Sequence, residues 1–158
     1  MKLSKRHLLI IIILAIVVIL FFTKSNLNTN INQNINSNKE ISKVCIKENC
    51  FSVELAKTEQ EKEKGLMFRE SLDKDKGMLF IYNTPEKSGF WMENTLIPLD
   101  IIWINKNNKI VHIVAAQPCK KDPCEIYSPD EDALYVLEIN ANLSRELDIK
   151  EGDIVSFK

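Results

Sequence analysis

The chain begins with a short basic segment that leads into an uninterrupted apolar run. Three basic residues lie within the first six positions, the apolar run LLIIIILAIVVILFF covers residues 8 to 22, and no charge follows until Lys24. At about 1.5 Å per residue the run covers about 22 Å, short of the roughly 30 Å hydrocarbon core. Flanking lysines that reach toward the interface lengthen its span. The pattern predicts a basic segment over 1–7 and a transmembrane signal anchor over 8–23.

A cleaved secretory signal shares this plan, but its cleavage site requires small residues. Here the run ends in Phe21-Phe22, and only Thr23-Lys24-Ser25 offers a weak site. No Cys directly follows the run, which argues against a lipoprotein. Basic residues before the run predict an inside N-terminus and an outside C-terminal domain. We expect a single-pass cell-membrane protein whose C-terminal domain is extracytoplasmic, or a secreted protein if the signal is cleaved.

Residues 24–42 change the pattern completely, since they are dominated by Asn and Ser and contain no aromatic residue. Such a composition buries too little apolar surface to offset the entropy cost of ordering. It predicts a disordered linker that tethers the next segment close to the membrane. Residues 43–158 then suit one small extracytoplasmic domain.

Within that domain, short apolar or alternating segments are separated by turn residues. Strand patterns cover 51–56, 77–82, 89–92, 99–104, 109–115, 133–139 and 153–157. Asn83-Thr84-Pro85 is expected to end the second strand, and residues 105–108 suit a hairpin turn. Thr58 and Glu61 form a capping-box pattern that opens a helix over roughly 59–66, and Ser144 can cap one further turn. The fold class is mostly β, a compact small sandwich or barrel of about seven short strands with one or two short helices.

Charge narrows the range of partners. The chain has 21 basic and 22 acidic residues, and the first 24 residues hold four of the basic and none of the acidic ones. The remainder is therefore net acidic and lacks any Lys/Arg cluster, so nucleic acid is an unsuitable partner. The expected partners are the membrane, through the N-terminal helix, and a small-molecule or envelope ligand.

Four cysteines form two pairs of equal spacing. Cys45 and Cys50 bracket CIKENC, and Cys119 and Cys124 bracket CKKDPC. An even number of cysteines in an exported domain favours disulfides, and residues 46–49 suit a hairpin tip that places the first pair face to face. We expect two local disulfides among three connectivities. A four-Cys zinc site is the alternative, although zinc sites prefer C-x2-C spacing.

Several motifs occur in order along the domain: GLMFRE, GMLFIY, FWMENTLIPLDIIWI, KIVHIV, the late Cys pair before Tyr127, VLEINAN and IKEGDIVSF. Together, over roughly Val53 to Phe157, the chain resembles the domain-of-unknown-function family 192, an uncharacterised conserved prokaryotic family. The resemblance implies a compact, predominantly β and often exported domain, and it implies no reaction. The sequence departs from the family pattern at Asn142 and Asp148, where Gly is common. Asn tolerates a left-handed turn, so the fold is expected to survive.

The candidate ligand-binding residues are polar or aromatic side chains within the block from Gly65 to Ile104. Arg69 could hold an anion with its planar donor fork, and Asp100 could be its buried partner, a turn cap or the acid of an active site. Trp91 could form the floor of a ligand groove, while core packing is the plainer alternative. Asn94 suits a turn or, less simply, a ligand hydrogen bond.

Two further chemistries stay open. Alternation turns Glu138 away from Leu137 and Ile139, toward solvent or toward a site where it could act as an acid or base. Three methionines in the same block, Met67, Met78 and Met92, could bind Cu(I) together with His112, although Met also fills irregular cores.

No nucleophile elbow, P-loop, HExxH or dinucleotide motif occurs, so the catalytic residues are unknown and no cofactor is predicted. The leading hypothesis is a membrane-anchored, extracytoplasmic binding module that holds a small molecule or envelope component near Arg69, Trp91, Asn94 and Asp100. The alternatives are a hydrolase-like enzyme using a buried carboxylate, a structural or assembly protein, and a Cu(I) carrier.

Overall fold

The structure, a computed structural model, describes residues 41–158, so the predicted basic segment, signal anchor and nearly all of the predicted linker lie outside the described residues. The strands are β1 (Lys43–Ile46), β2 (Asn49–Ala56), β3 (Lys76–Glu86), β4 (Phe90–Trp91), β5 (Leu99–Ile104), β6 (Ile110–Ala116), β7 (Ile126–Tyr127), β8 (Ala133–Asn140) and β9 (Val155–Phe157). The helices are α2 (Glu59–Lys64) and α3 (Leu143–Glu146). Within residues 41–158, no helix is long and apolar enough to cross a bilayer.

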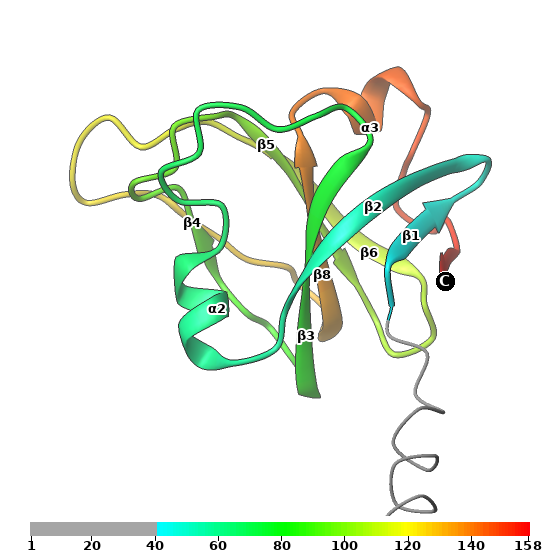
Figure 1. Cartoon of the computed structure of the whole chain (residues 1–158). Helices are drawn as coiled ribbons and strands as arrows, with labels where there is room; N and C mark the ends of the chain where they lie inside the picture. Colours follow the sequence, from blue (N-terminus) through cyan, green and yellow to red (C-terminus); the bar gives the residue numbers. More distant parts are fainter. Residues whose placement is uncertain (1–40) are drawn as a thin grey trace, which may run out of the picture. The chain divides into compact units, whose positions relative to one another are not determined.

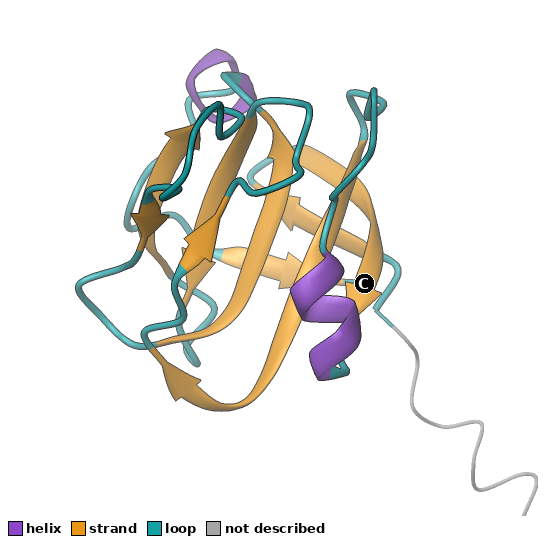
Figure 2. Cartoon of the chain, turned by 90° about the vertical axis from the view of Figure 1, so that its left-hand side faces the viewer, coloured by secondary structure: helices purple, strands orange, loops and turns teal. Residues whose placement is uncertain are grey.

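Seven strands form one sheet in the order β6-β5-β8-β3-β2-β1-β9, and β4 and β7 form a separate two-stranded sheet (Figures 1 and 2). All pairs in the large sheet are antiparallel except β2 and β3, which are parallel because α2 carries the chain back between them. The sheet curls into a half-barrel, which brings its two edge strands, β6 and β9, close to each other. An isolated bridge joins Lys109 to Ile154, and the Ile110 amide donates to the Asp153 carbonyl at 2.9 Å.

The core has two layers because successive strand residues point to opposite faces of the sheet. Residues from both edges of the sheet meet on its concave face, in what we call the α3-side core. It contains Val44, Ile46, Phe51, Leu79, Ile102, Ile104, Ile110, Leu137, Ile139, Leu143, Ile149 and Val155. The other face carries the α2-side core, which includes Leu66, Met78, Phe80, Phe90, Met92, Ile101, Trp103 and Val136. Both faces of the central strands are therefore covered.

The predicted strands are found in the structure with small changes of boundary. The segment 99–104 is a strand over its full predicted length and is buried at every position. The prediction that Asn83-Thr84-Pro85 ends the second strand is wrong, since β3 continues to Glu86. Its pairing with β8 shifts register between Ile81 and Glu86, and this irregularity accommodates a proline that cannot donate a ladder hydrogen bond.

The helix predictions also need one correction. The capping box at Thr58 and Glu61 is confirmed, because each side chain accepts a hydrogen bond from the backbone of the other residue. Ser144 does not cap α3 but lies inside it, and the N-cap residue is Asn142. Asn142 has φ +71° and Asp148 has φ +53°, so both positions where Gly is common adopt left-handed backbone.

Both cysteine pairs form disulfides as predicted. Cys45 is bonded to Cys50, and the two residues face each other across the β1–β2 hairpin. Cys119 is bonded to Cys124 within the loop that leads into β7. With all four thiols oxidised, the four-Cys zinc alternative has no thiolate ligands.

Candidate functional site

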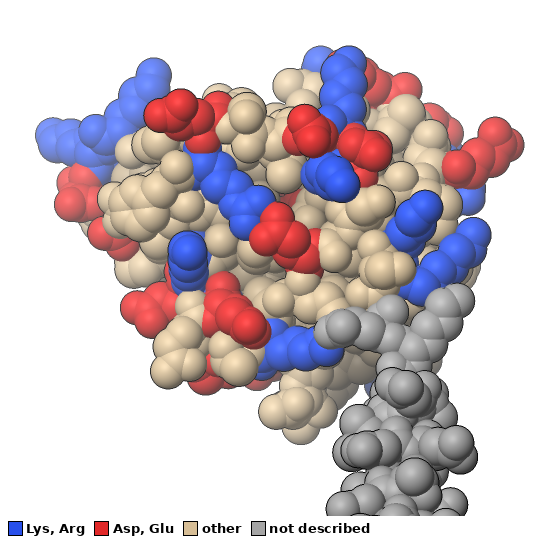
Figure 3. Space-filling view, in the orientation of Figure 1, with Lys and Arg blue, Asp and Glu red and all other residues tan. Residues whose placement is uncertain are grey.

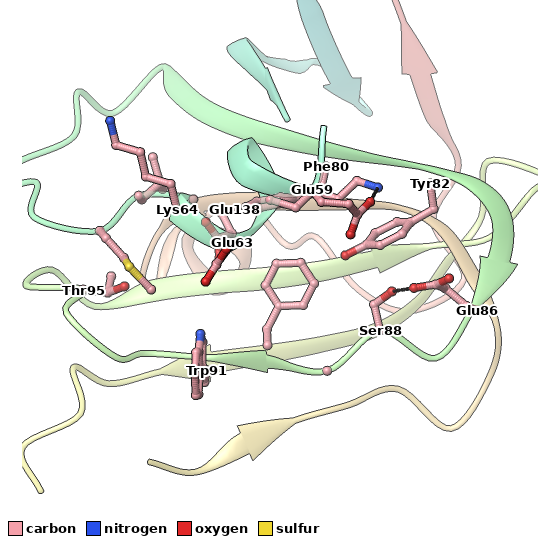
Figure 4. A pocket seen from close by; sticks show the side chains of 16 residues that line it. Glu59, Glu63, Lys64, Phe80, Tyr82, Glu86, Ser88, Trp91, Thr95 and Glu138 are labelled. Atoms are coloured by element: carbon pink, nitrogen blue, oxygen red, sulfur yellow. Dashed lines mark hydrogen bonds and ion pairs between the residues drawn. The ribbon is translucent and has the colours of Figure 1, made fainter. Parts of the chain in front are cut away.

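A cleft of about 500 Å³ opens between α2, the end of β3, and β4 (Figure 4). We call it the α2–β4 cleft. Its lining combines aromatic side chains with charged ones from α2 and β3. The residues are Glu59, Lys62, Glu63, Lys64, Gly65, Leu66, Met67, Phe80, Tyr82, Glu86, Ser88, Gly89, Phe90, Trp91, Thr95 and Glu138.

Glu138 is the buried polar residue of this cleft. It lies on β8 between Met78 of β3 and Ile101 of β5, and alternation turns it to the α2-side face. Only 5% of its surface is exposed, and its Oε2 atom has no hydrogen-bond partner among the described residues. Burial raises the pKa of this carboxyl from 4.5 to about 8, although Arg69 works in the opposite direction. Burial therefore favours the neutral, protonated form of this carboxyl at pH 7.

Arg69 does not reach Glu138, because its guanidinium is bound elsewhere. Its two terminal nitrogens donate to the two carboxylate oxygens of Glu54 at 2.5 and 2.7 Å. This bidentate pair holds the pKa of Glu54 below its ordinary value. The pair borders a second hollow, of about 360 Å³, beside the start of β3. The partner of Arg69 is thus Glu54 and not Asp100.

Aromatic rings form one wall of the cleft. Phe90 packs edge-on against Phe80, with ring centroids 4.9 Å apart, and against Trp103 at 5.7 Å. The Trp103 indole N–H donates to the Ser88 carbonyl and ties the start of this wall to β5. The neighbouring Trp91 lines the same cleft, and it is 48% exposed whereas Phe90 is buried. Trp91 therefore presents a large ring face to a ligand.

An ammonium group already lies against the aromatic side of the cleft. Lys62 Nζ is 4.4 Å from the centroid of the Tyr82 ring and 3.1 Å from Glu59 Oε1. Burial raises the pKa of Tyr82, so its ring stays neutral at physiological pH. Figure 4 shows both Tyr82 and Glu59 at this end of the cleft, with the Ser88 hydroxyl bonded to Glu86.

Asp100 lies on β5 and acts as a cap for α3. Its Oδ1 accepts from the Asn142 amide at 3.0 Å, and its Oδ2 accepts from the Ser144 amide at 2.8 Å and from the Ser144 hydroxyl at 2.6 Å. It is fully buried. This role is the turn cap among the alternatives weighed from sequence, and Asp100 does not line the α2–β4 cleft.

Asn94 occupies a tight turn with φ +53° and is exposed. Its carbonyl accepts from the Phe68 amide at 2.8 Å, and its side of the turn borders a small hollow of about 210 Å³ beside the Cys119–Cys124 loop. Of the four predicted ligand-binding residues, only Trp91 lines the α2–β4 cleft. Arg69, Asn94 and Asp100 lie at three other places.

The features of the cleft that sequence reasoning missed come from α2 and β3, above all Lys62 and Tyr82. The sequence did single out Glu138 as a possible acid or base, but could not tell a buried position from an exposed one. His112 contacts Glu151 at 3.1 Å and packs at a tilt of 40° against Trp103, while Met78 and Met92 are buried in the α2-side core. Copper binding by these residues stays a prediction.

Comparison with known proteins gives a family match over nearly all the described residues. The model of DUF192, described as "Uncharacterized ACR, COG1430", matches residues 42–157. A UPF0127 protein of Thermococcus gammatolerans is 30% identical over 107 residues, 66% of this chain and 65% of that protein. The UPF0127 protein TK1120 of Thermococcus kodakarensis is 26% identical over 105 residues, 66% of this chain and 64% of that protein. The chain thus spans slightly under two thirds of the length of these relatives.

Two solved structures share the fold. One is a protein of unknown function from Novosphingobium aromaticivorans, with a TM-score of 0.69 and 38% identity over 77% of this chain and 88% of that chain. The other, from Sinorhizobium meliloti and proposed to be a transcription regulator, has a TM-score of 0.66 and 31% identity over 73% of this chain and 90% of that chain.

Proposed function

Because the chain belongs to the DUF192 family, whose description names no activity, we propose a function from the site itself: a binding module that holds a small organic molecule in the α2–β4 cleft. The observation that carries this proposal is Glu138, a buried carboxyl that borders the cleft and has an oxygen without a partner. Buried polar atoms in folded proteins are nearly always hydrogen-bonded, so the missing partner is expected to be a ligand or an ordered water. The exposed ring of Trp91 supplies apolar contact beside it.

The proposal includes an extracytoplasmic, membrane-tethered location. Two disulfides in a domain of this size suit an oxidising compartment. The basic and apolar pattern before residue 24 supports an anchor that holds the domain outside the membrane. Lys/Arg and Asp/Glu residues are interspersed on the face in Figure 3, without a large patch of one sign. A small envelope-derived molecule fits this location better than a nucleic acid.

A thermal-shift screen of the full chain tests the proposal. The panel holds sugars, cell-wall fragments, amines and carboxylates. A ligand at 100 times its dissociation constant adds about 2.7 kcal/mol, which raises the melting temperature of a domain of this size by about 10 °C. Trp91→Ala is expected to lower the affinity for a ligand of this cleft about tenfold, because the contact with the ring contributes roughly 1.4 kcal/mol.

The matched control is Ile154→Ala, which removes another exposed apolar side chain that does not line the cleft. It should leave the ligand's affinity unchanged. A panel in which no compound shifts the melting temperature, or in which both variants weaken a ligand equally, counts against a binding role for this cleft.

An acid–base enzyme is the second candidate, and one observation favours it. Glu138 combines a cleft with a pKa raised to about 8, the condition expected of a general acid near neutral pH. Such an enzyme also needs a second reacting group, and no hydrogen bond links Glu138 Oε2 to any other lining residue. If a ligand found in the screen were consumed, with a rate that falls as pH rises through about 8 and is lost in Glu138→Gln, this candidate would replace the binding module.

A further inference from the structure

Two glutamates lie on the same face of the sheet, and only one of them has a charged hydrogen-bond partner. Glu54 of β2 and Glu138 of β8 flank Met78 of β3. Glu54 accepts hydrogen bonds from both terminal nitrogens of the Arg69 guanidinium. Glu138 receives no hydrogen bond at Oε2, although it is the more buried of the two. The terminal torsion of a glutamate is soft, so the Glu138 carboxyl can turn either oxygen toward the cleft that it borders. The structure leaves an acceptor there without a donor.

The charges around the cleft favour a positively charged donor. Four of the lining residues are glutamates and two are lysines. One of those lysines, Lys62, is already neutralised by Glu59. Glu138 favours its protonated form, which leaves Glu63 and Glu86 opposed by Lys64 alone within the lining. An anionic ligand would meet this excess of carboxylates, whereas a cation would be attracted by it.

The aromatic wall also suits a cation. Lys62 Nζ lies 4.4 Å from the Tyr82 ring centroid, which shows that an ammonium is accommodated over an aromatic face of this cleft. Trp91, the aromatic residue with the best face for a cation, lines the same cleft and is exposed. A ligand with an ammonium head and a carbon body could therefore contact Trp91 and reach Glu138.

We infer that the ligand of the α2–β4 cleft is an organic cation with an ammonium N–H, which pairs with the Glu138 carboxylate while its carbon body packs on Trp91. The inference rests on the proposed binding function. No covalent bond forms. Glu138 loses its proton to solvent, and the resulting carboxylate forms an ion pair with the bound ammonium.

This pairing is linked to pH because burial favours the protonated form of Glu138 when no cation is paired with it. Burial, opposed by Arg69, sets its pKa near 8, and a bound cation lowers that pKa. The other charged or titratable groups around it are Glu59, Lys62, Glu63 and Lys64 from the α2 segment, and Tyr82 and Glu86 from β3. Binding near pH 7, between the lowered pKa of the complex and about 8, is therefore expected to release about one proton per ligand.

A matched set of probes tests the charge of the ligand. Benzylamine, benzyl alcohol and benzoate share a shape and differ in charge at pH 7. Titration calorimetry of the full chain, in two buffers of different ionisation enthalpy, gives both affinity and proton release. Benzylamine should bind tightest and release about one proton. Glu138→Gln, which is neutral like the protonated acid, should abolish this proton release and lower the affinity for benzylamine about tenfold.

Glu48→Gln is the control, because it removes an exposed glutamate from the turn between β1 and β2, outside the cleft lining. It should leave both benzylamine affinity and proton release unchanged. If benzyl alcohol or benzoate binds as tightly as benzylamine in a manner that Trp91→Ala weakens, the cleft binds ligands but the inferred charge is wrong. If none of the three binds and the wider panel is also silent, the proposed function itself falls.

Discussion

Glu138 makes stability depend on pH in a window where few other carboxyl groups titrate. Its pKa is about 8 in the folded chain against 4.5 for an ordinary glutamate. Between these values the folded protein keeps a proton that the unfolded chain has lost. Stability therefore falls as pH rises from about 4.5 to 8 and levels off above that, by an amount on the order of a few kcal/mol.

We expect this fall to be flatter in Glu138→Gln than in the wild-type protein. The check is urea unfolding at several values between pH 5 and 8. Glu48→Gln is the control, because Glu48 is an exposed glutamate in the turn between β1 and β2, away from Arg69 and Glu138. Its stability profile should run parallel to the wild type over this window. A Glu138→Gln profile parallel to the wild type would show that Glu138 ionises normally.

Residue type alone did not separate the three acids that matter most here. Asp100, Glu54 and Glu138 all lie on strands. Asp100 accepts three hydrogen bonds from the start of α3, and Glu54 accepts hydrogen bonds from Arg69. Glu138 Oε2 accepts none among the described residues. Each outcome depends on a partner at least 15 residues away in the chain, or on the lack of one. Alternation gave the facing of Glu138 correctly, but whether that face is covered is a tertiary property.

Among the strands, the pattern of apolar residues predicts the bounds best where both faces of the strand are buried. The segment Leu99–Ile104 is buried on both faces and continuous in apolar residues, so its bounds follow from composition. The two-residue strand β7 had no such signal, because its pairing with β4 and not its own sequence defines it. The sequence predicts too short a β3, because Pro85 is typical of a strand end, whereas the sheet continues past it through an irregularity.

Gly77 sets how closely β3 and β8 approach below the cleft. A Cβ added at Gly77 would lie 2.6 Å from the Glu138 carbonyl oxygen. Backbone in a central strand pair cannot move away, so Gly77→Ala is expected to cost about 2–3 kcal/mol. Gly89 is the control: a Cβ there would lie 2.8 Å from Ile126 Cγ2, a methyl branch of an exposed side chain that can shift toward solvent.

Gly89→Ala should therefore cost less than about 1 kcal/mol, measured by the same urea unfolding. Equal costs at Gly77 and Gly89 would mean that the β3–β8 spacing is not fixed by the absent side chain.

For the whole molecule, the two disulfides offer a comparison with loop length held constant. Each joins cysteines five residues apart, so the chain-entropy estimate is the same for both, about 2 kcal/mol. Their positions differ. Cys45–Cys50 joins β1 and β2 next to the edge where the half-barrel closes. Cys119 donates its amide to the Met92 carbonyl at 3.3 Å, directly after the strand that carries Trp91.

The second disulfide is therefore expected to stabilise the cleft wall and the first to stabilise the sheet. Replacing Cys119 and Cys124 with Ala should speed amide exchange in β4 and β7 and weaken a cleft ligand, with β5 and β8 protected as before. Replacing Cys45 and Cys50 with Ala should lower global stability by about 2 kcal/mol and leave ligand affinity unchanged. If both double variants lose amide-exchange protection uniformly over the domain, β4 and β7 unfold only together with the rest of the domain. The Cys119–Cys124 disulfide would then have no local effect on the cleft.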